Sequence, residues 1–294
     1  MSEDIRLCAI DKWYPLFSTP KQYSFETLIT SLPSDFLSKD GIFAPSEEDL
    51  DKEPYPDIQD AIDEWGTVFP KTSWSAPLDA DFMVARSGLR CTTPTDVALV
   101  LQASNRISHD VHHAYDGTEL EGETYPVTLA LRQWKHIAPA GEVRVFLRRA
   151  GNCEWKVAGV CQRSAAYAEE WGNATNRAVI QDVSAKFAED IIAPRLDKLG
   201  LARAAVDIYL PHIRSTTAPR VIDINPWSGP TDPLLFTWEE LEELEGAEVR
   251  SVREGETRLM DPEREAQFPL EISAGLSGDV SVEQLVKLMQ QGGK

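Results

Sequence analysis

With 294 residues, the chain is long enough for two lobes that share a cleft or for one large α/β domain. Its hydrophobic content of 42% is ordinary for a globular protein, whereas 48 acidic against 29 basic side chains give a net charge of -19. A surface this acidic repels nucleic acid and anionic membranes, which excludes both as general partners and makes any local cluster of cations informative.

Signals for export or membrane insertion are missing from the sequence. The first six residues are charged and lack the apolar core of a signal peptide. No run of about 18 apolar residues is present to span a bilayer. The four cysteines, Cys8, Cys91, Cys153 and Cys161, are scattered and form no C-x-x-C pair, which is typical of reduced thiols. We therefore expect a cytoplasmic protein.

Helices and strands interleave along the chain. The acidic, proline-containing stretch 44–60 is predicted to be an exposed loop. Thr95 is expected to cap a helix that runs through Val97 and Leu101 to Ser104. Strands are predicted at 143–147, 157–160, 204–210 and 220–225. This alternation predicts an α/β or α+β class.

The second half of the chain carries further helix signals. Apolar residues recur every four positions over 183–191, and Pro194 is expected to end or kink that helix. Thr237 with Glu240, and Ser281 with Gln284, have the spacing of a capping box. The stretch 247–270 is predicted to be polar loop or frayed helix.

Two β-rich stretches, 204–210 and 220–225, flank a turn-rich link. Because side chains alternate along a strand, one face is expected to be apolar and the other polar. The apolar face comprises Val206, Ile208, Ile222 and Ile224, and the polar face comprises Asp207, Tyr209, Asp223 and Asn225. A hairpin centred near Ser215 would place Asp207 directly across from Asp223.

Facing carboxylates in such a hairpin repel each other, because opposed Cβ atoms are about 4.5–5.5 Å apart. A divalent cation would remove this repulsion, and Mg²⁺ takes carboxylate and amide oxygens as ligands. The alternative is a solvated polar strand face on which the aspartates never converge. The pattern therefore leaves open a magnesium site at Asp207, Asp223 and Asn225 and an ordinary polar face.

A local excess of positive charge stands out between 131 and 163. Seven cations occur there (Arg132, Lys135, Arg144, Arg148, Arg149, Lys156 and Arg163), against only Glu142 and Glu154. Arg144 should share a strand face with Glu142 and Phe146. Arginine forks match phosphate oxygens, so the patch could bind phosphate, or it could be a charged sheet edge that opposes aggregation.

Other local patterns are weaker. Lys71 by itself fits a surface lysine. The spacing of His109, His112 and His113 allows a transition-metal site, but no fourth ligand is evident and a polar surface is favoured. The Walker A loop, the G-x-G-x-x-G turn and the G-x-S-x-G elbow are all absent from the sequence. A P-loop enzyme, a Rossmann dehydrogenase and an α/β hydrolase are therefore disfavoured.

A series of motifs, in this order, resembles the cell division cycle protein 123 family over roughly residues 7–245. They are Trp13-Tyr-Pro-x-Phe17, Phe69-Pro-Lys-x-x-Trp-Ser-Ala-Pro-x-Asp-Ala80, Leu131-Arg-x-Trp134, Glu142-x-Arg144, Gln162-Arg163, Ile222-Asp-x-Asn-Pro-Trp227 and Thr231-Asp-x-Leu-Leu-Phe-Thr-Trp-Glu-Glu-Leu241. The resemblance implies an ATP-grasp fold, in which two lobes grip Mg·ATP. It also implies relatives that are chaperones, assembling eukaryotic initiation factor 2 by binding its gamma subunit.

Carried over by position, the resemblance implies a set of ligand contacts. Lys71 and Arg144 would contact phosphates, and Arg163 would lie on the phosphate or acceptor side. Arg132 and Trp134 would lie in the hinge, and Glu142 would belong to the same nucleotide site. The nucleotide-facing loop would contain Ser75, Ala76 and Asp79, and magnesium would be held by Asp207, Asp223 and Asn225. The corresponding organisation is an N-terminal lobe at 1–130, an ATP-grasp lobe at 131–245 and a polar segment with a C-terminal helix at 246–294.

One departure from the family pattern bears on function. Gln162-Arg163 is followed here by Ser164-Ala-Ala-Tyr167, whereas the family has an aspartate and then aromatic residues. Because this change falls on the acceptor side, we favour a carboxylate–amine ligase acting through an acyl-phosphate on a small acid and amine. Arg144 and Arg163 would then be its catalytic cations. The alternatives are an initiation factor 2 chaperone that binds the gamma subunit and a pseudo-enzyme that merely binds nucleotide.

Overall fold

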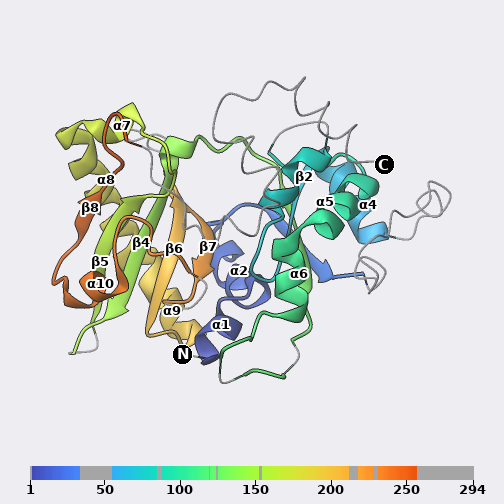
Figure 1. The fold of residues 1–294 in the computed structure, drawn as a ribbon, viewed down its shortest axis with the longest axis horizontal. Helices are drawn as coiled ribbons and strands as arrows, with labels where there is room; N and C mark the ends of the chain where they lie inside the picture. Colours follow the sequence, from blue (N-terminus) through green and yellow to red (C-terminus); the bar gives the residue numbers. More distant parts are fainter. Residues whose placement is uncertain are drawn as a thin grey trace, which may run out of the picture. The chain divides into compact units, whose positions relative to one another are not determined.

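The computed structural model describes residues 2–33, 55–84, 88–118, 120–123, 125–151, 154–211, 218–227 and 231–256 (Figure 1). All of them belong to one structural unit, Met1–Thr257. The expectations for 44–54, for the tip of the link near Ser215, for Cys153 and for the helix at Ser281 lie outside the described residues.

A three-stranded antiparallel sheet forms the first lobe. It consists of β1 (Thr27–Ser31), β3 (Thr128–Gln133) and β2 (Val68–Thr72) in that order. Three helices complete the lobe, namely α4 (Pro56–Trp65), α5 (Pro94–Ala103) and α6 (Asn105–His112). Their apolar residues pack with Val68, Leu129 and Leu131 in one core cluster. The alternate side chains of β2 and β3 therefore point away from these helices.

Two expectations for the first lobe need correction. Helix α4 begins inside the stretch 44–60 that was expected to be a loop, because Ile58, Ala61 and Ile62 form a buried helical face. Helix α5 is capped by Thr93, not by Thr95: Thr93 and Asp96 exchange the two hydrogen bonds of a capping box. Pro94 then occupies the first helical turn, where its missing N–H costs nothing.

A five-stranded sheet forms the second lobe, in the order β7-β6-β4-β5-β8. The strands are β4 (Glu142–Arg149), β5 (Trp155–Gln162), β6 (Arg203–Tyr209), β7 (Arg220–Asn225) and β8 (Glu248–Arg250). The first four pair antiparallel, whereas β8 pairs parallel to β5. Strand β8 falls in the stretch that was expected to be loop or frayed helix.

One long helical segment packs against this sheet. It comprises α8 (Ala174–Phe187), a π-helical turn η4 (Ala188–Ile192) and α9 (Ala193–Leu199). Phe187, Ile192 and Leu196 share a core cluster with Val145 and Val206 of the strands. The predicted change at Pro194 takes the form of this π-helical turn, after which Pro194 lies in the first turn of α9.

The opposite face of the sheet carries a smaller apolar cluster around Phe146. Trp227, Phe236 and Leu241 pack there, the last from α10 (Trp238–Glu243). The predicted capping box of Thr237 and Glu240 opens this helix. Two short elements complete the lobe, the 3₁₀ turn η3 (Pro139–Gly141) and α7 (Glu169–Gly172).

The predicted pairing of the two acidic strands is confirmed, with one change of register. Asp207 lies directly across from Asp223, but the next pair is Ile208 with Val221. Ile222 is therefore the extra residue of a β-bulge. As a result Val221, and not Ile222, joins Val206, Ile208 and Ile224 in the core.

The N-terminal helices α1 (Ser2–Leu7) and α2 (Ile10–Ser18) lie beside the second lobe (Figure 1). Trp13 and Phe17 of α2 are fully buried in the same core cluster as Val221 and Leu196. The chain therefore starts against the second lobe, builds the first lobe, and returns to the second after β3.

The expected mixed α/β class is confirmed, and its strands form two sheets. Cys8, Cys91 and Cys161 are buried thiols. Within the described residues, no helix combines the length and the apolar content that crossing a membrane would require.

A substitution at Gly159 can test the packing of β5 against Phe236 and α10. A Cβ atom at this position would lie 2.8 Å from the Phe236 ring and 3.0 Å from Leu241. Gly159→Ala should therefore lower the free energy of unfolding by about 1–3 kcal/mol through overpacking, as measured by chemical denaturation. Gly246→Ala is the control, because nothing lies within 4 Å of its added methyl group. Equal stability of the two variants would contradict this packing.

Candidate functional site

Three charged side chains line up across neighbouring strands of the second lobe. Arg144 of β4 lies opposite Asp207 of β6, which lies opposite Asp223 of β7. Asn225 is two residues further along β7 and therefore on the same face. Arg144 also shares its face with Phe146, as predicted, so the polar row adjoins the apolar cluster around Phe146.

Asp207 is the most strongly held carboxylate of this row. Arg144 grips it with two hydrogen bonds, Nε to Oδ1 at 2.7 Å and Nη2 to Oδ2 at 2.8 Å. Arg163 donates a third, from Nε to Oδ2 at 3.0 Å. Burial alone would raise the pKa of the Asp207 carboxyl, but the charges of Arg144 and Arg163 outweigh it and lower the pKa to about 2.

The two arginines are themselves fixed. Arg144 also donates to the carbonyl oxygen of Asp232, and Arg163 donates to the Glu142 carboxylate at 3.1 Å. Burial raises the pKa of Glu142, with Arg163 opposing the shift. The charge of Asp207 raises the pKa of Arg163. Glu142, Arg144, Arg163 and Asp207 thus form one connected ion network, which the sequence predicted only as a shared region.

Among the described residues, one ion pair joins the two lobes at this site. Lys71 Nζ of β2 lies 2.8 Å from Asp223 Oδ2 of β7. The Lys71 side chain is only 2% exposed, so the surface lysine considered from the sequence is in fact buried. Burial lowers the pKa of Lys71, and the charge of Asp223 opposes that shift. Such a buried ammonium is held in place by its partner.

Arg132 of β3 is the cation with unused hydrogen-bonding capacity. It lies on the same sheet face as Lys71, because Phe69 is its direct partner on β2. The residue is 6% exposed, and its Nε and Nη2 atoms find no hydrogen-bond acceptor among the described residues. Burial lowers the pKa of Arg132, with Asp223 opposing the shift. A buried guanidinium with two idle donors fits an anion.

The balance of charge in this cluster is opposite to that of the whole chain. Four cations, Lys71, Arg132, Arg144 and Arg163, meet three carboxylates, Glu142, Asp207 and Asp223, for a formal charge of +1. The chain as a whole carries -19. A positive, largely buried cluster between two lobes favours a multiply charged anion as its ligand.

The chemistry of the donor set also fits a magnesium ion. Asp207, Asp223 and Asn225 provide hard oxygen atoms on one strand face. Each carboxylate already has a lysine or arginine as its partner. A divalent ion bound to the carboxylates would therefore take the place of positive charge that these side chains now supply. Asn225 uses its amide nitrogen, donating to the Ala205 carbonyl at 3.2 Å and to Asp207 at 3.4 Å.

The segment predicted to face a nucleotide makes contacts within the first lobe. The backbone N–H and hydroxyl of Ser75 both donate to Asp110. Asp79, in the 3₁₀ helix η2 (Leu78–Met83), accepts from Ser104 and from the backbone N–H groups of Asn105 and Arg106 at the start of α6. Ala76 packs at the edge of the first-lobe core. These residues are not drawn into the ion network, and their contact with a nucleotide stays a prediction.

Trp134 does lie where the chain passes between the lobes, immediately after β3. Its indole N–H donates to the Gly88 carbonyl at 2.7 Å, and the Arg90 guanidinium stacks 4.4 Å from its ring. Its backbone N–H bonds to Thr67. Trp134 is thus held against the first lobe. The role predicted for it, in the hinge near a nucleotide, stays a prediction.

Asp110 is a buried, hydrogen-bonded residue whose placement sequence reasoning missed. It was treated as part of a polar His109–His113 surface, yet it is 5% exposed. Its spacing of three from the buried Ile107 was the signal, because such residues share a helix face. The three histidines are exposed, and within the described residues no three His, Cys, Asp or Glu side chains converge as metal ligands.

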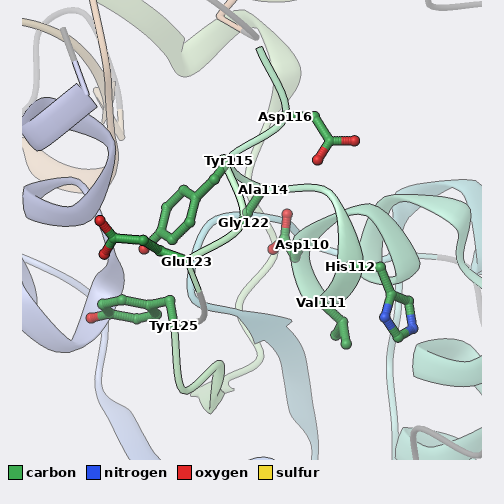
Figure 2. A pocket seen from close by; sticks show the side chains of 9 residues that line it. All are labelled: Asp110, Val111, His112, Ala114, Tyr115, Asp116, Gly122, Glu123 and Tyr125. Atoms are coloured by element: carbon green, nitrogen blue, oxygen red, sulfur yellow. The ribbon is translucent and has the colours of Figure 1, made fainter. Parts of the chain in front are cut away.

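A pocket on the other side of Asp110 is separate from the cation cluster. Figure 2 shows it between the end of α6 and the segment 120–125, with Asp110, Tyr115 and Glu123 in its wall. Lys71, Arg132, Arg144 and Arg163 do not line it.

Asp207→Asn tests the ion network. Removing the carboxylate leaves Arg144 without its anion and Arg163 with Glu142 alone, so the free energy of unfolding at pH 7 should fall by about 3–5 kcal/mol. A carboxyl whose pKa is depressed by folding stabilises the fold above its unfolded pKa of about 3.9, and this contribution is lost as the pH falls through the folded pKa. The deficit of the variant should therefore persist down to about pH 4 and shrink only toward pH 2.

The matched control for this prediction is Asp197→Asn. Asp197 pairs with Arg149 at the surface, where both side chains are substantially exposed. That change should alter stability by no more than about 1 kcal/mol. Denaturation curves recorded from pH 7 to pH 2 provide the measurement. If both variants lose the same free energy of unfolding, the buried network stabilises the fold no more than a surface ion pair does.

Comparisons with known proteins identify the family. The model of the D123 family matches residues 52–277. A Vanderwaltozyma polyspora protein named translation initiation factor eIF2 assembly protein is 32% identical over 288 aligned residues, covering 81% of this chain and 74% of that protein. A Candida glabrata protein named cell division cycle protein 123 is 38% identical over 204 residues, covering 68% of this chain and 54% of that protein.

The fold has a solved counterpart. The structure of C-terminally truncated Cdc123 from Schizosaccharomyces pombe is 27% identical and superposes with a TM-score of 0.70, covering 86% of this chain and 98% of that one. The expected α/β class, divided into two lobes, is confirmed, whereas the ATP-grasp assignment stays a prediction.

These findings correct the expected function. Relatives that match over most of the chain are named for the assembly of eIF2, so the expectation of a carboxylate–amine ligase is wrong. The chaperone alternative is the one that the relatives favour, and the roles expected for Arg144 and Arg163 stay predictions. On the family match and the shared fold together, the chain belongs to the D123 family, also known as the cell division cycle protein 123 family.

Proposed function

We propose that this chain is an assembly chaperone for eukaryotic translation initiation factor 2 that holds Mg·ATP between its lobes and binds the gamma subunit. The observation that carries the proposal is the match, over most of the chain, to relatives named eIF2 assembly proteins. The positive cluster between the lobes supports the nucleotide part. A cytoplasmic location goes with such a function.

The nucleotide would bind where the two sheets meet. Lys71 and Arg132 from the first lobe offer an ammonium and two idle guanidinium donors for phosphate oxygens. Asp207, Asp223 and Asn225 from the second lobe would hold the magnesium ion, with Arg144, Arg163 and Glu142 keeping Asp207 in place. The ion would supply a charge that neutralises the phosphates as they approach the carboxylates.

In this chaperone, the nucleotide would hold the two lobes in one arrangement. Among the described residues, Lys71 and Asp223 form the ion pair that links the two sheets directly, and other polar contacts between the lobes run through the N-terminal helices. A nucleotide that contacts Lys71 on one side and, through magnesium, Asp223 on the other would add several. Binding energy of this kind stabilises one arrangement of the lobes without any chemical step.

The gamma-subunit assignment can be tested by direct binding. The purified chain should capture isolated initiation factor 2 gamma subunit in the presence of Mg·ATP, and should not capture isolated alpha or beta subunit. Size-exclusion chromatography with light scattering would show a one-to-one complex. Absence of a complex with the gamma subunit, at concentrations of about 10 μM where even weak interfaces are populated, would overturn the partner assignment.

The magnesium assignment needs a separate titration. Asn225→Ala should weaken Mg·ATP binding by at least about tenfold, equivalent to 1.4 kcal/mol, because it removes a metal ligand while every cation of the cluster stays. Its affinity for ATP in excess chelator should stay close to that of the unmodified chain. Isothermal titration of both forms gives the comparison.

Lys12→Ala is the control for this titration. Lys12 is a half-exposed cation paired with Asp11, far in sequence from the cluster, and its loss should change neither affinity. If Asn225→Ala lowers the affinity for metal-free ATP as much as for Mg·ATP, Asn225 is not a magnesium ligand.

A further inference from the structure

A tight turn follows Lys71 at the end of β2. The backbone N–H of Thr72 donates to the Ser75 carbonyl at 2.8 Å. The turn therefore closes on itself over four residues. Its position decides where the last residues of β2, including Lys71, come to lie.

One carboxylate from a different element fills this turn. Asp110 of α6 accepts hydrogen bonds through Oδ2 from the Ser75 N–H at 2.8 Å, from the Trp74 N–H at 3.3 Å and from the Thr72 hydroxyl. Its Oδ1 accepts from the Ser75 hydroxyl at 2.8 Å. Four donors converge on one buried carboxylate, and hydrogen bonds to a charged acceptor are about twice as strong as neutral ones.

The same turn is also tied to the N-terminal helices. The Ser73 carbonyl accepts from the Ile10 N–H at 2.8 Å, and the Trp74 indole donates to the Ile5 carbonyl at 2.7 Å. Because α2 packs in the second-lobe core, the turn connects α6 of the first lobe to elements of the second. Lys71 leaves this junction and reaches Asp223, 2.8 Å from its ammonium group.

We propose that Asp110 is a positioning residue for phosphate recognition, which acts by holding the Thr72–Ser75 turn and thereby fixing Lys71. This role rests on the proposed nucleotide site, because Lys71 is its effector. Among the described residues, Asp110 forms no hydrogen bond with the ion network, although burial lowers the pKa of Lys71 and the charge of Asp110 acts to raise it. A lysine side chain has a flexible four-carbon stem, so its recognition of phosphate depends on a fixed backbone at its base.

The first test needs no nucleotide. Asp110→Asn keeps the shape of the side chain but replaces one acceptor oxygen by a donor and removes the charge. In the full chain without ligand, amide exchange of Trp74 and Ser75 should accelerate at least tenfold, and the Lys71 amine should become modified at least threefold faster by acetic anhydride, as quantified by mass spectrometry. Unchanged modification of Lys71 would overturn the proposal.

Asp96→Asn is the matched control. Asp96 also accepts from two backbone N–H groups and a hydroxyl, those of Thr92 and Thr93, but it caps α5 and has no bond to the Lys71 turn. It should leave the exchange of Trp74 and Ser75 and the modification of Lys71 as they are. If Asp110→Asn does not fold, Thr72→Val removes one donor to Asp110 at nearly constant shape, and Lys71 modification should still increase.

The second test asks whether Asp110 acts through Lys71. Asp110→Asn should weaken Mg·ATP binding about tenfold and leave adenosine binding unchanged. In a Lys71→Ala background the same change should have less than a twofold effect, because the group that it positions is gone. Equal effects in both backgrounds would make Asp110 a merely structural residue. If the unmodified chain binds no ATP, the proposed function fails, while Lys71 modification still decides whether Asp110 holds Lys71.

Discussion

The ion pair between Lys71 and Asp223 is the interaction on which the candidate site depends. A buried ammonium is costly unless an anion lies beside it, and this requirement brings a strand of each lobe together at one point. The carboxylate of Asp223 in turn lies next to Asp207, whose charge is balanced by Arg144 and Arg163. Removing any member therefore changes the charge balance of its neighbours.

This arrangement explains how one site can suit both a cation and an anion. In the structure, arginine and lysine side chains neutralise the carboxylates, and two guanidinium donors of Arg132 are left over. A metal ion bound to the aspartates would take over part of that neutralisation, which would release Lys71 toward phosphate oxygens. Nucleotide and metal would therefore favour each other's binding. The metal would neutralise the aspartates, and the phosphates would neutralise the lysine that the metal releases.

The expectation of a ligase came from the altered segment that follows Gln162-Arg163. Gln162 is fully buried, accepts a hydrogen bond from the backbone of Val252 and donates to the Ala166 carbonyl. It therefore anchors the segment after β5. The unusual residues that follow Arg163 belong to a loop beside the ion network, and their change alone says little about an acceptor. A departure from a family motif is evidence about chemistry only when the altered residue faces the reacting groups.

Sequence patterns by themselves determined the secondary elements with strong periodicity and the polar face shared by Asp207, Asp223 and Asn225. Alternation along a strand is a local property, so the pairing of Asp207 with Asp223 followed from the position of the link. The bulge at Ile222 did not follow, because it depends on which register the two strands adopt together.

Only the tertiary structure decided which charges meet. Lys71 and Asp223 are 152 residues apart, and Ser75 and Asp110 are 35 apart, so no local spacing predicts either contact. The burial of Lys71 and Arg132 depends on the packing of two sheets whose strands come from distant parts of the chain. For the same reason Asp79 and Asp110 could not be told apart from the sequence: both are aspartates near β2, but one caps a helix and the other holds the turn beside the site.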